Sequence, residues 1–220
     1  MLTGMQGAIS NLCANSDDFN DHLFLHIAQD LITQGYSVNI NAMPEEILNA
    51  LWCQQRHRES RAFHPAGIGH GAHHYVDCGI RGDEISWITG ESLAEQQWFE
   101  WCSALQHYLN SKLFLGLFSF ESHFAHYPPD AFYCRHIDTF HRETSRVLSV
   151  VVYLNRDWDP NDGGELVLYS DEDDTKGIYV LPTWGTLVIF FSKEFPHEVL
   201  PAKRDRYSVA GWYRLRSCHD

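Results

Sequence analysis

The stretch "RHIDTFHRETSRVLSVVVYLN", residues 135–155, joins a cluster of polar side chains to a run of β-branched residues. Its first half contains two pairs of the form His-any-acid, His136/Asp138 and His141/Glu143. With 14 histidines and 29 acidic residues among 220, about two such triplets are expected by chance, so the triplet alone carries little information. Its surroundings must decide whether either pair binds a metal.

The second half of this stretch lies in a region where apolar and polar residues alternate with a period of two. Many short strands joined by turns of Asp, Gly and Pro are typical of a β-sandwich or barrel, and eight such strands favour a double-sheet jelly roll. We expect strands near residues 114–126, 132–139, 146–154, 164–170, 177–181, 186–192, 197–200 and 206–214.

Before residue 114 the pattern is largely helical. Residues 16–35 carry apolar side chains at helical spacing and end at Gly35, residues 43–58 open with Pro44 and two acids, and "SLAE" at 92–95 has the form of a capping box ahead of an apolar-periodic run. Strands are expected within 36–42 and 77–90, with a loop rich in Gly and His at 61–74.

These elements predict a mostly β fold with N-terminal helices. We expect one domain at residues 17–220, after a loose N-terminus at 1–16. Within it, helical and β support at about 17–113 would pack on a jelly-roll core at about 114–214.

Composition excludes several classes of protein. An apolar fraction of 44% and an aromatic fraction of 14% indicate a globular chain. No apolar run reaches the ~18 residues needed to cross a membrane, and no secretory signal is visible at the start of the sequence. The six cysteines are scattered without a C-x-x-C motif, which favours a reducing cytoplasm. The net charge of −13 argues against nucleic-acid binding.

His136 and Asp138 become more informative once they are placed on a strand. Side chains at positions i and i+2 point to the same face, about 7 Å apart along the strand, so imidazole and carboxylate could hold one ion while Ile137 faces away. His197 on a later strand supplies a third ligand. Two His and one Asp leave three positions open, which is the facial triad of non-haem Fe(II) oxygenases, whereas zinc more often has a third His or a Cys.

Arg206 follows the distal His197 by one turn, at the start of the last predicted strand. A guanidinium there can hold a carboxylate through two parallel hydrogen bonds. It suits a co-substrate with one end on the metal and the other on the arginine, and 2-oxoglutarate has that shape.

Three motifs together show a resemblance to a known family. "IRGDEISWI" (80–88), "YLNRDWDPNDGGELVLY" (153–169) and "HEVLPAKRDRYSVAGWY" (197–213) resemble the Fe(II)- and 2-oxoglutarate-dependent prolyl 4-hydroxylases. The likeness extends over roughly residues 20–214 and is greatest to the hypoxia-sensing prolyl hydroxylases of animals and their bacterial relatives. It implies a double-stranded β-helix fold, with Fe(II) as the bound metal, 2-oxoglutarate and O2 as co-substrates, and ascorbate as a supporting reductant.

The resemblance also implies roles for individual residues. His136, Asp138 and His197 match the iron ligands, and Arg206 matches the residue that binds the distal carboxylate of 2-oxoglutarate. Tyr153 would hydrogen-bond the same carboxylate, and Tyr127 would line the co-substrate pocket. Trp212 would pack beside the metal. Arg81 or Asp83 would form a charged pair with Arg146, and Gly163–Gly164 would form a turn. Ala210 departs from the family, where a hydroxyl residue is expected near the metal.

The function implied is hydroxylation of a prolyl residue in another cytoplasmic protein, with elongation factor Tu as the candidate target and succinate and CO2 as products. The Gly-rich loop at 61–74 would close over the target peptide, while His70, His73 and His74 within it would be exposed loop residues. Two alternatives stay open: the same chemistry on a free amino acid or other small molecule, and a non-catalytic cupin-like module that binds metal or 2-oxoglutarate. The oligomeric state cannot be predicted from the sequence.

Overall fold

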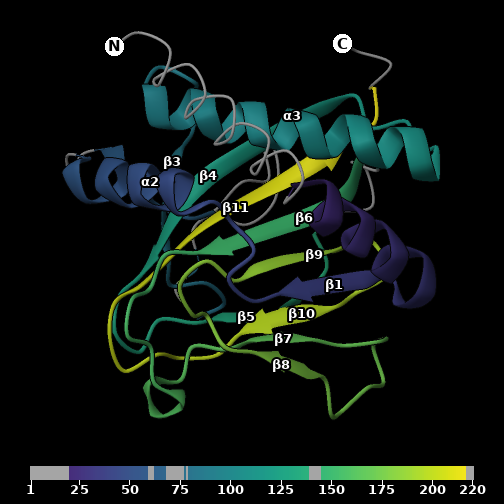
Figure 1. The fold of residues 1–220 in the computed structure, drawn as a ribbon. Helices are drawn as coiled ribbons and strands as arrows, with labels where there is room; N and C mark the ends of the chain where they lie inside the picture. Colours follow the sequence, from purple (N-terminus) through teal and green to yellow (C-terminus); the bar gives the residue numbers. More distant parts are fainter. Residues whose placement is uncertain (1–19, 59–61, 68–76, 78, 139–144, 217–220) are drawn as a thin grey trace, which may run out of the picture.

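Two antiparallel β-sheets face each other, and helices cover the outer face of the larger sheet (Figure 1). The computed structural model describes residues 20–58, 62–67, 77, 79–138 and 145–216. The larger sheet has seven strands in the order β1-β9-β6-β11-β4-β3-β2, and the smaller has four in the order β5-β10-β7-β8. This arrangement confirms the mostly β, double-stranded β-helix fold with helices on one side.

Every strand predicted after residue 114 overlaps one of the observed strands β4 to β11. The larger sheet contains β1 (Tyr36–Asn39), β2 (His64–Pro65), β3 (Glu84–Trp87), β4 (Ser119–Tyr127), β6 (Arg146–Tyr153), β9 (Leu187–Phe191) and β11 (Arg206–Arg214). The smaller sheet contains β5 (Tyr133–His136), β7 (Leu166–Leu168), β8 (Ile178–Val180) and β10 (His197–Val199).

Strand β4 begins later than the alternation at 114–118 predicts. Phe114 has φ +54° and Gly116 has φ +66°, so the backbone turns before it extends. The side-chain amide of Asn110 fixes that turn, because it donates to the carbonyl oxygen of Leu117 (2.8 Å) and accepts from the Leu117 N–H (2.8 Å). The apolar residues of 114–118 therefore connect a helix to the sheet instead of extending the strand.

In the described part of the chain, three α-helices precede the jelly roll. The first is described from residue 20 to 34, buries Ile27 and Leu31, and ends at Gly35, whose φ of +80° favours glycine. It is followed by α2 (Glu45–His57), which starts directly after Pro44, and by α3 (Leu93–Leu113). All three were predicted from periodicity and end signals, and the loose N-terminus predicted at 1–16 lies outside the described residues.

The predicted capping box of α3 forms only in part. Ser92 accepts a hydrogen bond from the Glu95 N–H, as a cap should, but the Glu95 carboxylate does not bond back to Ser92. It accepts instead from the backbone N–H groups of Gly90 and Glu91 and pairs with Arg58 at the end of α2. Glu95 therefore ties two helices and a loop together, which sequence spacing alone does not reveal.

The region predicted as a loop at 61–74 contains a short strand. His64 and Pro65 form β2 and pair with β3, with His64 opposite Ile85. A two-residue edge strand is compatible with Pro65, since its missing N–H is not needed at a sheet edge. Residues 68–74 of the predicted closing loop, including His70, His73 and His74, lie outside the described residues.

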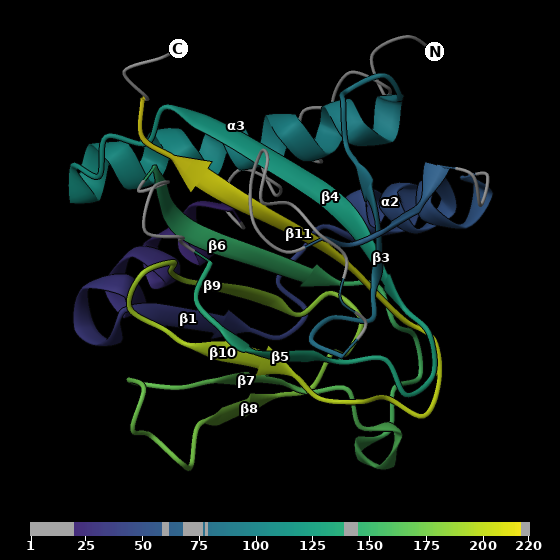
Figure 2. The same cartoon turned by 180° about the vertical axis from the view of Figure 1, so that it is seen from behind.

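Alternating residues give the larger sheet two different faces. On β6, Leu148, Val150 and Val152 pack against the helices in one apolar core. Tyr153 packs instead between the two sheets, in a second core. Strand β11 pairs with β4 on one side and β6 on the other, and Figure 2 shows it running between them. Its alternate residues therefore point into the space between the sheets from the middle of the larger one.

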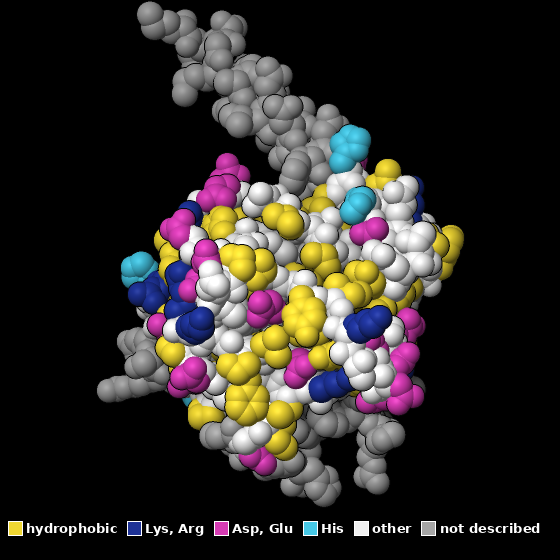
Figure 3. Space-filling view, turned by 90° about the horizontal axis from the view of Figure 1, so that it is seen from below, with side chains coloured by type: hydrophobic (Ala, Val, Ile, Leu, Met, Phe, Trp, Pro, Cys, Tyr) yellow, Lys and Arg dark blue, Asp and Glu magenta, His cyan; other side chains and the backbone are white. Residues whose placement is uncertain are grey.

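One face of the described surface carries a mixture of side-chain types. Figure 3 shows the end of the molecule that lies below the smaller sheet, where acidic, basic and hydrophobic side chains are interspersed over the described part of this face. Among the described helices, none combines the length and the hydropathy that crossing a bilayer requires.

Candidate metal centre and co-substrate pocket

A cavity of about 560 Å³ lies between the two sheets, and most of the residues singled out from the sequence line it. His136 and His197 come from the smaller sheet, where the two are direct register partners on β5 and β10. Tyr153, Arg206 and Trp212 come from β6 and β11 of the larger sheet. The cavity is therefore built by both sheets, from several segments of the chain that are far apart in sequence.

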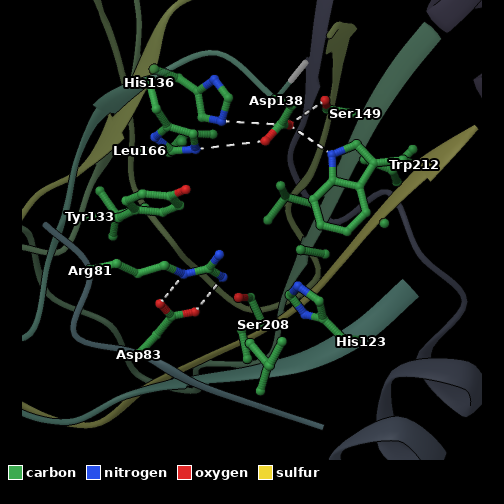
Figure 4. A pocket seen from close by; sticks show the side chains of 18 of the residues that line it. Arg81, Asp83, His123, Tyr133, His136, Asp138, Ser149, Leu166, Ser208 and Trp212 are labelled. Atoms are coloured by element: carbon green, nitrogen blue, oxygen red, sulfur yellow. Dashed lines mark hydrogen bonds and ion pairs between the residues drawn. The ribbon is translucent and has the colours of Figure 1, made fainter. Parts of the chain in front are cut away.

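The structure brings His136, Asp138 and His197 together, with one ligand atom of each within 4.8 Å of the others. His136 Nε2 lies 3.6 Å from Asp138 Oδ1, and His197 Nε2 lies 3.7 Å from Asp138 Oδ2 (Figure 4). Within the described residues, this is the only group of three or more His, Cys, Asp or Glu with such geometry. The alternative pair His141/Glu143 lies outside the described residues.

Both imidazoles are oriented for metal binding by their second nitrogen. His136 Nδ1 lies 2.8 Å from the carbonyl oxygen of Cys134, and His197 Nδ1 lies 3.0 Å from that of Phe195. A carbonyl accepts only, so each Nδ1 carries a hydrogen, and in the neutral ring Nε2 then has the free lone pair that a metal needs. Burial and the adjacent His136 lower the pKa of His197 to about 4, which keeps this ring neutral at pH 7.

Asp138 does not sit on the strand, contrary to the prediction. Strand β5 ends at His136, and the chain then bends, so Ile137 also lines the cavity instead of facing away. The Asp138 carboxylate is held from the opposite sheet, because Oδ2 accepts from Ser149 Oγ (2.6 Å) and Trp212 Nε1 (2.8 Å). Burial alone would raise the pKa of Asp138, but the two histidines and Ser149 hold it well below its usual range.

Arg206 is buried, with 2% of its surface exposed, and it lines the same cavity. Its Nε donates to the carbonyl oxygen of Gly164 (2.8 Å), and its guanidinium carbon lies 5.0 Å from the ring centres of both Tyr127 and Tyr153. Among the described residues no carboxylate forms a salt bridge with Arg206. A buried cation without an anionic partner is costly, so this end of the cavity is built for an anion.

Tyr153 supports the same conclusion. Its side chain is fully buried, and Oη has no hydrogen-bond partner among the described groups. Burial raises the pKa of Tyr153 to about 12, against the opposing charge of Arg206, so the phenol keeps its proton and can donate it. A carboxylate between Arg206 and Tyr153 would satisfy both groups.

The predicted turn at Gly163–Gly164 positions Arg206. Gly164 has φ +72°, and a Cβ on it would lie 2.8 Å from the Ala202 Cβ and 3.2 Å from the Arg206 Cδ. Only glycine fits here without displacing the arginine that its carbonyl group anchors.

Comparison with known proteins identifies the site. The sequence profile of the 2OG-Fe(II) oxygenase superfamily matches residues 122–214, which contain the His-Asp-His group and Arg206. Human Egl nine homolog 1 is 30% identical over 143 residues, which cover 61% of this chain and 33% of that protein. The crystal structure of a Pseudomonas putida prolyl-4-hydroxylase is 40% identical and superposes with a TM-score of 0.77, over 88% of this chain and 100% of the other.

The chain belongs to the 2OG-Fe(II) oxygenase superfamily. A prolyl hydroxylase from Trichoplax adhaerens, solved in complex with a peptide of the hypoxia inducible factor oxygen degradation domain, is 28% identical with a TM-score of 0.75. That match covers 89% of this chain and 90% of the other. This oxygenase spans about a third of the length of human Egl nine homolog 1.

The residues present fit the metal and co-substrate that the 2OG-Fe(II) oxygenase family implies. Two imidazoles and one carboxylate form the donor set of a facial triad, so His136, Asp138 and His197 would hold Fe(II). Arg206 and Tyr153 would hold the distal carboxylate of 2-oxoglutarate. With O2, the bound iron and 2-oxoglutarate supply the oxidising chemistry. Ser149 and Trp212 keep the Asp138 carboxylate aimed at the metal.

Trp212 and Tyr127 both line the cavity, whereas the predicted partner of Arg146 is wrong. Arg146 pairs with Glu121 (2.8 Å) and lies over the Trp212 ring (3.6 Å). It does not pair with the early strand, because Arg81 and Asp83 satisfy each other through a two-point contact of 2.5 and 2.9 Å.

Sequence reasoning missed Ser149, Tyr133 and Ser208 in this oxygenase. Tyr133 stacks on the His136 ring, with centroids 3.6 Å apart, and its position depends on the pairing of β5 with β10. Ser149 and Ser208 occupy cavity-facing positions of strands that are otherwise mostly apolar. Small hydroxyl residues in phase with Tyr153 and Arg206 were a usable signal, since alternate residues on a strand share a face.

Proposed function

We propose that this oxygenase hydroxylates a prolyl residue in another protein, with 2-oxoglutarate converted to succinate and CO2. The observation that carries the proposal is that one cavity contains both the His-Asp-His group and Arg206, a buried cation without an anionic partner among the described residues. A non-catalytic sensing module would need only one of these two features. The chain's own residues bind the reactants, orient them and keep water out.

Two comparisons support a prolyl residue in a polypeptide as the substrate. The Pseudomonas putida neighbour is described as a prolyl-4-hydroxylase, and the Trichoplax adhaerens neighbour was solved with a peptide bound. Trp87 at the cavity is 46% exposed, which gives an entering peptide an aromatic surface on which to pack. Elongation factor Tu is the target that the family resemblance suggests, and the cytoplasm is the location that the scattered cysteines predict.

The test is a search for substrates without a preselected target. Purified protein would be supplied with Fe(II), 2-oxoglutarate and ascorbate, and incubated with lysate from its source and, separately, with elongation factor Tu. Mass spectrometry should detect a prolyl peptide that is heavier by one oxygen, together with stoichiometric succinate. The Asp138→Ala variant provides the inactive control. If only free proline or another small molecule gains oxygen, the protein-substrate proposal is wrong while the oxygenase chemistry stands.

A further inference from the structure

His123 is a buried histidine in the cavity that neither the metal nor the co-substrate uses. It lies on β4 and lines the cavity with 2% of its surface exposed, and its Nδ1 has no hydrogen-bond partner among the described groups. It is not one of the three residues whose ligand atoms gather within 4.8 Å. A buried polar atom without a partner is unfavourable in the free protein, so a ligand is expected to satisfy it.

The neighbouring side chains of His123 hold its ring in place but do not provide a hydrogen-bond partner for Nδ1. The ring meets two indoles edge-on, with its centroid 5.3 Å from that of Trp87 and 5.4 Å from that of Trp212. Figure 4 shows His123 beside Trp212. Its register partner on β11 is Ala210, whose methyl group offers no polar atom. The nearby Asp83 has both carboxylate oxygens engaged by Arg81. The imidazole can therefore neither rotate freely nor find an acceptor in these side chains.

His123 lies between the exposed Trp87 at the mouth of the cavity and the His-Asp-His group. Register pairing sets Trp87, His123 and Ala210 side by side on β3, β4 and β11. At one end of this set Trp87 is 46% exposed, and beyond the other end Trp212 donates to the ligand Asp138. A substrate that reaches the metal over Trp87 must pass His123.

The charge state of His123 suits a neutral hydrogen-bonding role. Burial, together with the positive charge of the nearby Arg81, lowers the pKa of His123 to about 4. At pH 7 the ring is therefore neutral and carries one N–H and one lone pair.

The chemistry of a prolyl residue determines what the ring can bind. The nitrogen of proline carries no hydrogen, so the polar atoms next to the target ring are two carbonyl oxygens, both acceptors. We infer that His123 donates a hydrogen bond to a substrate carbonyl oxygen next to the target proline and thereby selects an acyl-prolyl segment. This inference rests on the proposed function and adds a specificity-determining residue to the same site.

The test pairs changes in the protein with changes in the substrate. The probe is the prolyl peptide found in the lysate search, synthesised with normal amides and with a thioamide at each of the two carbonyls in turn, because sulfur is a weak acceptor. His123→Met removes the donor and keeps an apolar side chain of similar reach, and His123→Gln restores an N–H. His126→Met is the matched control, since His126 lies on the same strand but bonds Asp205 at the surface.

We expect His123→Met to raise the KM for the normal peptide roughly two- to tenfold, the range for one hydrogen bond, while the 2-oxoglutarate requirement stays unchanged. His123→Gln should recover most of the loss, and His126→Met should match wild type. In wild type one thioamide should weaken binding, and that penalty should vanish in His123→Met. Equal thioamide penalties in both proteins, or no recovery by Gln, overturn the role of His123. If wild type hydroxylates no prolyl peptide, both the proposed function and this inference are wrong.

Discussion

The two faces of the larger sheet are made by the same strands, yet buried polar atoms without a hydrogen-bond partner lie on one of them. On the helix side, Leu148, Val150 and Val152 are at most 1% exposed and belong to one apolar core. On the cavity side, Tyr153 and His123 are almost equally buried, but each has a polar atom without a partner. Of two neighbouring residues on one strand, Val152 contributes to folding through apolar burial, whereas Tyr153 combines apolar burial with the cost of an unpaired hydroxyl group.

This difference separates stability from function along a single strand. Each unpaired buried polar group costs about 1–3 kcal/mol in the free protein, and the apolar helix side offsets that cost. Local conflicts of this kind are expected at functional sites. Substitutions on the cavity side should therefore change binding and turnover, and substitutions on the helix side should change stability.

The largest effect is expected from Asp138→Ala on the cavity side. Loss of the carboxylate removes one of three metal ligands and leaves the Ser149 and Trp212 donors without their acceptor. Turnover and bound iron should both fall to background, while the metal-free protein should still unfold cooperatively. Iron content, succinate release and thermal unfolding would be measured together. Asp173→Ala, which alters an exposed acid, should behave as wild type, and normal activity of Asp138→Ala would remove the triad assignment.

Leu148→Ala, on the helix side, should lower stability and leave the binding of the co-substrate unchanged. Leu148 is fully buried in the larger core, so truncation should lower the free energy of unfolding by about 2–5 kcal/mol. Denaturant titration measures this loss. Below the unfolding transition, the 2-oxoglutarate requirement of the variant should equal that of wild type. A large rise in that requirement would show that the two faces are coupled through the strand and would contradict the separation proposed above.

Arg206→Ala should affect the co-substrate and spare the metal. A hydrogen bond to a charged group contributes roughly 1.5–3 kcal/mol, so the 2-oxoglutarate requirement should rise by about tenfold to over a hundredfold. Arg206→Lys should recover little, because an ammonium group cannot make the two parallel hydrogen bonds of a guanidinium. Arg204→Ala is the matched control, since this side chain is 46% exposed two residues earlier. An unchanged titration in Arg206→Ala would leave the buried guanidinium without its assigned ligand.

The smallest effect is expected from Glu95→Gln, which tests a polar group outside the cavity. Burial alone would raise the pKa of Glu95, but Arg58 and the N–H groups of Gly90 and Thr89 hold it below its usual range. A carboxyl with a depressed pKa stabilises the fold above its unfolded pKa, and that contribution is lost as pH falls through the folded value. The variant should therefore be about 1 kcal/mol less stable at pH 7, the difference between a charged and a neutral acceptor.

The pH dependence distinguishes this charge effect from a packing defect. Between pH 7 and pH 3 the difference in unfolding free energy between wild type and Glu95→Gln should shrink, because Glu95 becomes protonated. Denaturant titrations at several pH values measure it. Glu91→Gln, at an exposed acid beside the same helix start, should show no such trend, and a constant difference for Glu95→Gln would exclude the charge effect.

Prediction from sequence succeeded where the pattern is local and failed where it depends on register. Alternation located the strands, and His136, His197 and Arg206 could be selected because each stands at a strand end near a turn. Asp138 was selected for the wrong reason, since its carboxylate is held by the opposite sheet and not by a continued strand. Partners across the sheets are set by tertiary pairing, so spacing along the chain could not predict the Glu121 contact of Arg146.

Strand β11 has a consequence for how the chain folds as it is synthesised. It lies between β4 and β6, although it is the last of the described strands to leave the ribosome. Until residues 206–214 are available, β4 and β6 lack the strand that joins them, and the anion-binding arginine is missing. Pairings between residues so distant in sequence also form slowly. A chain that ends before residue 206 can therefore already contain all three metal ligands, His136, Asp138 and His197, but it lacks the arginine that would hold 2-oxoglutarate, so the complete site forms only with the last strand.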